Sequence, residues 1–199
     1  MDMRFSPKHE VRPARAFALL GLVLVMLLGS TGCLFQTRYE NLALTRKDLL
    51  DYGVSLSFPV EWSVKRGEFF HLEARSIRPA ELRALFEYRG LEKIKKDRES
   101  KRQYAAGWYR AIALSYEGWR YISQDQDLSD SEGTFRFEGT YVDEQNGRAP
   151  LALRKIGILR FRGTRLHALY YTAPESEFEL LRPLFEKMDE QHRYFAPVE

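Results

Sequence analysis

The sequence predicts an α+β domain in which an antiparallel β-sheet (a meander) packs against helices, including a C-terminal helix. Apolar and polar residues alternate in several short segments, which is typical of strands with one buried face. Turn residues at 146–147 and 162–164 separate three of these segments, which indicates that they pair as an antiparallel meander. Apolar residues at helical spacing follow from Phe178 onward and predict a closing amphipathic helix.

Length and composition limit what the chain can be. Its 199 residues are enough for one ordinary domain, and an aromatic fraction of 14% favours a folded core despite 30% charged residues. The formal net charge is +3, to which residues 1–32 contribute four basic and two acidic side chains. The remaining chain is therefore close to neutral, and we expect no nucleic-acid partner. A single cysteine excludes an internal disulfide.

The first 32 residues have the organisation of a signal peptide. Four basic residues within positions 1–15 precede an uncharged run from Ala16 to Gly32. The apolar part, Ala16–Leu28, has the length of a signal-peptide hydrophobic region and is short for a membrane-spanning helix of about 20 residues. The small residues GSTG follow at 29–32, immediately before Cys33.

This arrangement resembles the lipobox of bacterial lipoproteins, although Ser30 stands where a leucine is usual. The resemblance implies a signal cleavage site between Gly32 and Cys33, and attachment of diacylglycerol and a further acyl chain, such as palmitate, to Cys33. By analogy with enteric sorting, Leu34 favours the inner leaflet of the outer membrane, with the domain in the periplasm. The alternative is an uncleaved single-pass anchor, because uncharged residues continue to Thr37.

The chain therefore divides into a lipoprotein signal peptide at 1–32, a lipidated N-terminus and tether at 33–50, and a single globular α+β domain at 51–199. The domain is expected to begin with a half-buried strand at 53–59, where apolar and polar residues alternate up to Pro59. Trp62 and Val64 continue this alternation, and residues 69–74 suggest a second short strand.

Residues 79–115 are expected to be largely helical. Residues 79–86 are good helix formers that begin with a proline, and Leu91 and Ile94 keep a helical period. Residues 95–103 contain no apolar side chain, and we interpret them as a solvated helical stretch; a basic patch for anionic lipid or lipopolysaccharide is the alternative. A stripe at helical spacing then predicts a face buried on the sheet: Tyr104, Ala105, Trp108, Ile112 and Ser115.

Short strands and the closing helix complete the domain, in the order strand 119–122, acidic loop 125–133, and strands 135–141, 151–161 and 166–171. The acidic loop lacks the ordered spacing of calcium sites, so no metal ion is expected there. Thr172 is expected to cap the closing helix, whose apolar face consists of Phe178, Leu181, Phe185 and Met188.

A strand that ends in Phe58-Pro59-Val60-Glu61-Trp62, a helical insertion, a meander and a closing helix together resemble the Mog1/PsbP-like fold. The resemblance covers about residues 50–195. Members of this family include a photosystem II subunit, a Ran-binding protein and small bacterial lipoproteins. The resemblance therefore implies a role in binding or assembly, and it assigns no functional residue of the domain.

The sequence contains no catalytic, cofactor-binding or metal-binding motif. No serine lies in a GxSxG motif, and glycine loops of the phosphate-binding kind are absent. His71 and His167 lie in strand-like segments, and His192 lies near the end of the last helix. None of them has a second histidine or acid at the spacing of a zinc motif. We therefore expect no enzyme activity, cofactor or metal ion.

Two functions from different classes remain open. The preferred one is a membrane-anchored cell-envelope lipoprotein with a non-catalytic binding or assembly role, whose partner is an envelope protein, glycan or lipid bound through the sheet edge or an aromatic surface. The alternative is an envelope hydrolase acting on glycan or lipid. That function requires a concave pocket in which acids, His71 or His167 converge and have shifted pKa values.

Overall fold

The computed structural model describes residues 42–66, 70–77, 81–91, 97–130, 132–144 and 149–195. Its strands are β1 (Leu44–Leu49), β2 (Val54–Pro59), β3 (Ser63–Lys65), β4 (Leu72–Arg75), β5 (Arg83–Gly90), β6 (Arg120–Leu128), β7 (Glu132–Asp143), β8 (Leu151–Arg162), β9 (Arg165–Pro174) and β10 (Arg193–Tyr194). The described helices are α2 (Arg98–Ser115) and α3 (Phe178–Glu190), with short 3-10 turns at η1 (Leu50–Tyr52) and η2 (Glu175–Glu177).

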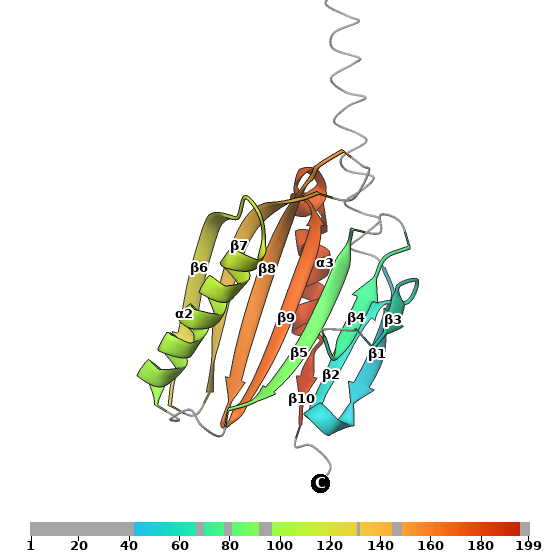
Figure 1. Cartoon of the computed structure of the whole chain (residues 1–199). Helices are drawn as coiled ribbons and strands as arrows, with labels where there is room; N and C mark the ends of the chain where they lie inside the picture. The colour runs from blue at the N-terminus through green and yellow to red at the C-terminus, as the bar shows by residue number, and fades with distance from the viewer. Residues whose placement is uncertain are drawn as a thin grey trace, which may run out of the picture.

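The described strands form two antiparallel sheets (Figure 1). The larger sheet has the order β3-β4-β5-β9-β8-β7-β6, and the smaller has the order β1-β2-β10. The predicted meander is β7-β8-β9, in which every neighbouring pair is antiparallel. Gly163 makes the β8–β9 turn with a φ of 56°, a left-handed conformation that favours glycine. The turn predicted at 146–147 lies outside the described residues.

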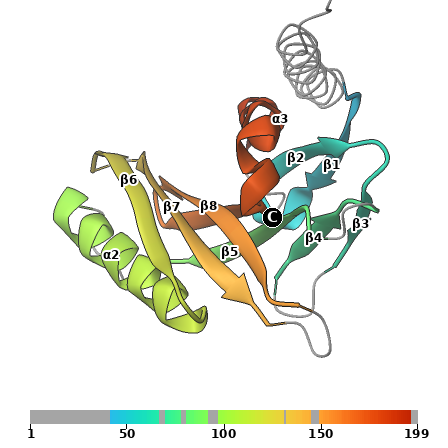
Figure 2. The same cartoon turned by 90° about the horizontal axis from the view of Figure 1, so that it is seen from above.

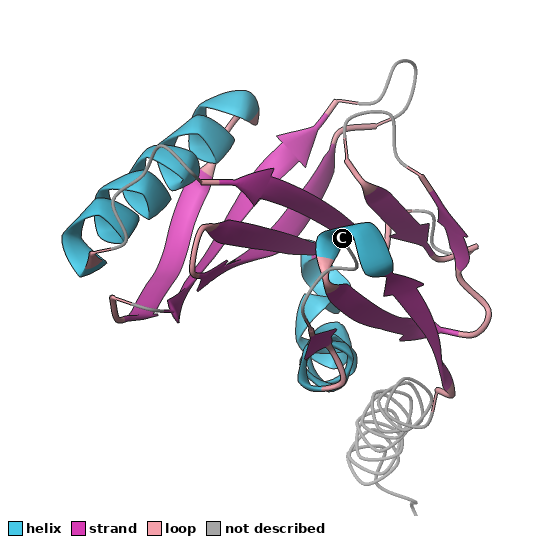
Figure 3. Ribbon diagram, turned by 90° about the horizontal axis from the view of Figure 1, so that it is seen from below, coloured by secondary structure: helices cyan, strands magenta, loops and turns pink. Residues whose placement is uncertain are grey.

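Different elements cover the two faces of the larger sheet (Figures 2 and 3). α2 packs on one face, and α3 and the smaller sheet pack on the other. Alternate residues of β9 accordingly enter two separate cores: Ala168 and Tyr170 face α2, while Leu169 and Tyr171 face α3. The predicted antiparallel α+β architecture is therefore confirmed, and so is the buried face of the closing helix: Phe178, Leu181, Phe185 and Met188.

α2 carries most of the predicted apolar stripe. Ala105 is buried, whereas Ser115 at the end of the stripe is exposed. Lys101, which lies in the stretch interpreted as solvated, is buried, and its Nζ donates to two backbone carbonyls of the β6–β7 turn at 2.9 and 2.6 Å. The larger side chains of the stripe are half-buried against the sheet: Tyr104, Trp108 and Ile112.

In the described part of the chain, neither helix combines the length and the apolar character that a membrane crossing requires.

The helix predicted from residue 79 onward is wrong over residues 83–90, because Arg83–Gly90 forms strand β5 between β4 and β9. Ala84 and Phe86 are buried in the core under α3, and Leu85 is buried in the core under α2. A strand that is buried on both faces has a continuous apolar run. Such a run cannot be distinguished from a buried helix by its periodicity.

The N-terminal and acidic segments also differ from the predicted boundaries. Residues 44–49, which the sequence assigned to the tether, form β1 and pair with β2 along its whole length. The central residues of β1 are exposed, so its sequence lacks the apolar pattern that marks a buried strand. The acidic loop predicted at 125–133 is only a short turn, because β6 continues to Leu128 and β7 begins at Glu132.

The strand predicted at 53–59 is β2, but it is buried on both faces. It is the central strand of the smaller sheet, and the side chain of Asp48 from β1 covers Ser55, whose Oγ donates to Asp48 Oδ1 at 2.6 Å. Thr172, the predicted helix cap, lies within β9. The chain reaches α3 through η2, and no side chain caps the start of that helix.

Candidate functional site

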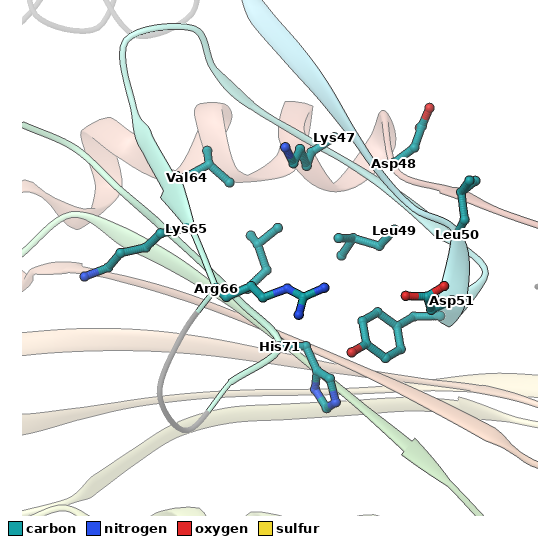
Figure 4. Close-up of a pocket in the computed structure, with 11 residues that line it drawn as sticks. Lys47, Asp48, Leu49, Leu50, Asp51, Val64, Lys65, Arg66 and His71 are labelled. Carbon is teal, nitrogen blue, oxygen red and sulfur yellow. The ribbon is translucent and has the colours of Figure 1, made fainter.

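A pocket of about 440 Å³ lies between the smaller sheet and the β3–β4 pair. The end of β1 together with η1 forms one wall, and β3 and the start of β4 form the other (Figure 4). Its apolar lining consists of Leu49, Leu50, Val64 and Leu72. Its charged and polar lining consists of Lys47, Asp48, Asp51, Tyr52, Lys65, Arg66 and His71.

Two of the charged residues are already engaged with neighbours. Asp48 lies 3.1 Å from Arg46, and the hydrogen bond from Ser55, together with the charge of Arg46, holds the pKa of Asp48 below its usual value. Lys65 lies 3.8 Å from Glu73, and its side chain extends away from the pocket in Figure 4. These two residues therefore contribute little to the charge that a ligand would meet.

Lys47, Asp51 and Arg66 remain to set the charge of the pocket. None of the three forms an ion pair within the described part of the chain. The Arg66 side chain extends across the pocket toward Asp51 (Figure 4). Two cations thus face one carboxylate, and the guanidinium supplies several hydrogen-bond donors in a fixed plane. This lining suits a ligand that carries an anionic group beside an apolar part.

His71 offers a further donor to the pocket. Its Nδ1 accepts a hydrogen bond from the backbone N–H of Tyr88 at 3.1 Å. In the neutral ring the proton must therefore reside on Nε2, which is left to donate. The ring packs edge-on against Tyr52, with 4.6 Å between the ring centroids.

His167 lies behind the pocket and is 2% exposed. Its Nε2 donates to the backbone carbonyl of Tyr52 at 2.9 Å, since a carbonyl can only accept. Burial lowers the pKa of His167, and the charges of Arg162 and Arg165 lower it further against the opposing effect of the bond to Tyr52. His167 is therefore neutral at pH 7 and positions η1, which forms the pocket wall.

The structure thus brings His71 and His167 together around Tyr52. Asp51 lines the same pocket as His71, but no carboxylate among the described residues hydrogen-bonds to either ring. His192 lies near the end of the last helix, as predicted. Its side chain is buried, and its Nδ1 lies 3.6 Å from Asp189 Oδ1.

Asp189 has a structural role, because it pairs with Arg160. Arg160 donates two hydrogen bonds to its carboxylate, at 2.7 and 2.6 Å. Because its carboxylate is held in this way, the Asp189–His192 pair is a structural one.

The remaining predicted sites gain no support as chemical centres. Within the described residues, no three His, Cys, Asp or Glu side chains are placed to hold a metal ion. Asp125 and Asp127 lie within β6, so they do not share a loop with Asp130. Cys33 and the cleavage site at 32–33 lie outside the described residues, so lipidation stays a prediction.

Sequence reasoning missed a buried lysine on β8. Lys155 is 1% exposed, and its Nζ donates to the hydroxyl of Tyr116. Burial, assisted by the positive charge of Arg83, lowers the pKa of Lys155 to about 7. A signal was present, because Lys155 occupies a core position in the alternation that continues with Leu159 and Phe161.

Comparison with known proteins supports the fold. The chain is similar to cyanobacterial PsbP (CyanoP) from Synechocystis sp. PCC 6803, with 9% identity and a TM-score of 0.59 over 77% of this chain and 93% of that one. It is also similar to the Ran-binding protein Mog1p of Saccharomyces cerevisiae, with 7% identity and a TM-score of 0.53 over 78% of this chain and 97% of that one.

A third similar structure is LpqN, involved in cell envelope biogenesis of Mycobacterium tuberculosis. Identity is 15% and the TM-score 0.51, over 78% of this chain and 92% of that one. The sequence matches no protein-family model and no curated protein. At these identities the likeness establishes the fold, and the expected Mog1/PsbP-like architecture is confirmed.

Proposed function

We propose that the chain is a membrane-anchored cell-envelope lipoprotein whose domain binds another envelope component without catalysing a reaction. Residues 1–32 are removed, and the lipid on Cys33 holds the domain at the periplasmic side of the outer membrane. The bound component carries an anionic group that enters the pocket beside Tyr52, where Arg66 and Lys47 neutralise it.

The observation that carries the binding role is the way in which His71, in the pocket, and His167, behind it, are engaged. In a Ser-His-Asp triad, a carboxylate orients the catalytic histidine. Here His71 is oriented by a backbone amide, and His167 is committed to the Tyr52 carbonyl. The groups left free in the pocket are two cations, Lys47 and Arg66, the His71 donor and one carboxylate, Asp51, and this excess of positive charge favours binding of an anion.

Two of the similar structures are consistent with this role. LpqN is involved in cell envelope biogenesis, and Mog1p is a Ran-binding protein. Both descriptions concern those proteins, and they support a cell-envelope location and a binding role for this chain by analogy of fold.

A lipid on Cys33 would keep the domain close to the membrane. Nine peptide units connect Cys33 to Leu42, the first described residue, and they span at most about 32 Å when fully extended. The anchor therefore limits the domain to partners at or near the membrane surface. Two or more acyl chains make such anchoring stable.

The anchor is tested with Cys33→Ala. This change should block lipidation and leave a full-length precursor, visible by mass spectrometry and by loss of labelled palmitate. The matched control is Ser30→Leu, which introduces the usual residue and should still be processed. Cleavage of Cys33→Ala to the mature size would exclude the lipoprotein assignment.

The pocket is tested by in-cell crosslinking, purification of the lipidated protein and mass spectrometry of what accompanies it. An anionic envelope component should accompany the wild type and be lost in Arg66→Glu. Arg102→Glu, which changes an exposed arginine of α2, is the control and should retain it. Equal recovery from both variants would exclude the pocket as the binding site.

The hydrolase alternative keeps one favourable observation, since His71, Asp51 and Arg66 share one concave surface. Hydrolysis of purified envelope glycan or lipid by the wild type, lost in His71→Gln, would replace the binding role by this activity.

A further inference from the structure

The β6 edge of the larger sheet is open. β6 is the last described strand of that sheet and pairs with β7 alone, so about half of its backbone N–H and C=O groups point away from the sheet. α2 runs alongside β6 (Figures 1 and 2). A groove of about 540 Å³ is lined by α2, by the residues that connect α2 to β6, and by Gln124 of β6. This combination of a free strand edge and an adjacent helix can accept an extended segment as an additional strand.

The register of β6 determines which side chains face the groove. The pairing of β6 with β7 shifts by one residue between Tyr121 and Ser123. Because of this shift, the side chains of β6 face the same side of the sheet as their β7 partners both before and after it. Tyr121 and Gln124 consequently lie on the α2 side of the sheet. Asp125 and Asp127 lie on the opposite side, so the two sides of this edge differ in charge.

The floor of the groove is aromatic and tightly packed. The Trp119 ring lies on Gly139, where an added Cβ would come within 2.3 Å of it. Trp119 Nε1 donates to the hydroxyl of Tyr109 at 3.2 Å, and the Tyr109 ring contacts the Tyr121 ring with 6.5 Å between centroids. These contacts shape the groove before any partner arrives, which lowers the entropy cost of binding.

Exposed apolar side chains gather at this edge. Leu114 on α2 is 82% exposed, and Tyr121 and Ile122 on β6 are 58% and 39% exposed. Arg110 is the only charged residue that lines the groove, and no described residue forms an ion pair with it. The groove therefore presents apolar surface around one uncompensated cation.

We propose that the α2–β6 groove binds an extended segment of another envelope protein, which adds to the sheet along β6. On the α2 side this segment places a large apolar side chain between Leu114 and Tyr121 and a carboxylate at Arg110. Its alternate residues lie on the other side of the sheet and are basic, opposite Asp125 and Asp127. This inference rests on the envelope location proposed above and adds a protein partner at a second surface.

A second copy of this chain fits the groove less well. An antiparallel pairing of β6 with itself would keep each side of the two sheets in register. The copy would then present Tyr121, Gln124, Gln126 and Leu128 on the α2 side, and none of these supplies a carboxylate to Arg110. Its own Asp125 and Asp127 would lie on the same side as those of the first copy.

The test uses the full-length lipidated protein in detergent and a phage-displayed library of linear peptides. In the selected peptides, every second residue should be basic. The residues between them should include one acidic and one large apolar residue. Arg110→Glu should weaken binding of the best synthetic peptide by at least about tenfold, and Arg102→Glu should leave it unchanged. Replacing the acidic residue of the peptide by lysine should restore binding to Arg110→Glu.

Hydrogen–deuterium exchange then locates the peptide. Strand addition should slow exchange of the backbone amides of Arg120–Leu128. Failure to select any peptide, equal binding to Arg110→Glu, or protection elsewhere would overturn the proposal. Protection around Tyr52 and His71 would leave the proposed pocket in place while excluding the groove, and the result for Cys33→Ala is independent of both.

Discussion

Lys155 is a basic residue in the interior of the domain, and no carboxylate among the described residues forms an ion pair with it. Its Nζ donates to the hydroxyl of Tyr116 and lies 5.5 Å from the ring centroids of Tyr141 and Tyr170. Burial and the charge of Arg83 lower the pKa of Lys155 to about 7, from a usual value of 10.5. Replacing Lys155 by methionine keeps much of the apolar stem and removes the charge.

The size of the effect follows from the pKa difference. In the folded state Lys155 loses its proton near pH 7, whereas in the unfolded chain it keeps the proton up to about pH 10.5. The unfolded state therefore binds more protons across this interval, and the free energy of unfolding rises with pH. The full penalty below pH 7 is about 5 kcal/mol, of which about 2 kcal/mol should disappear between pH 7 and pH 9.

Urea unfolding of the wild type and of Lys155→Met at about pH 7, 8 and 9 measures this effect. We expect Lys155→Met to be the more stable protein at pH 7, by no more than about 5 kcal/mol, because attraction of Nζ to the tyrosine rings offsets part of the penalty. The advantage should shrink by about 2 kcal/mol by pH 9. Lys47→Met, at an exposed position, is the control and should show neither effect.

One result would refute this reasoning. If Lys155→Met is less stable than the wild type by an amount that does not change between about pH 7 and 9, the buried ammonium stabilises the fold through its contacts with the tyrosines.

Two further substitutions test the packing and the half-buried Arg160–Asp189 ion pair. Gly157→Ala should lower the free energy of unfolding by about 1–3 kcal/mol, because a Cβ there would lie 2.1 Å from the Phe137 ring. Urea unfolding measures the loss, and an unchanged stability would mean that the ring moves aside at no cost. Asp189→Asn should cost about 3 kcal/mol at pH 7, because it leaves the half-buried Arg160 without its carboxylate. Burial would raise the pKa of Asp189, but the nearby His192 and the hydrogen bonds and charge of Arg160 lower it to about 2. The stabilisation should therefore be complete above about pH 4 and be lost as the pH falls toward 2, as thermal unfolding across this range will show. A difference between the two proteins that stays constant down to about pH 2.5 would contradict this assignment.

The closing helix and the meander could be predicted because each depends on a pattern within one short segment. α3 needs one buried face, and Phe178, Leu181 and Phe185 supply it at helical spacing. The β8–β9 turn needs a residue that accepts a positive φ, which Gly163 provides. The N-terminal pattern that ends at Cys33 is local in the same way, so it yields a sharp prediction for an experiment.

The failures lie where distant segments decide the outcome. β5 has good helix-forming residues, but backbone pairing with β4 and β9 and burial on both faces outweigh that local preference. β1 has an exposed centre, so no apolar pattern marks it, and pairing with β2 alone makes it a strand. The acidic residues of β6 resemble a loop for the same reason, since an exposed edge strand needs no apolar face.

By itself, the sequence determined the fold class and the secondary-structure order of the C-terminal half, because residue type and local spacing express these features. It named His71 and His167 only as candidates for the alternative hydrolase function. Only the tertiary structure decided what the histidines do. Tyr52 and His167 are 115 positions apart, and their hydrogen bond exists because the smaller sheet folds against the larger one. Periodicity describes the faces of one segment, whereas a pocket depends on which segments meet, and that is settled by packing over the whole chain.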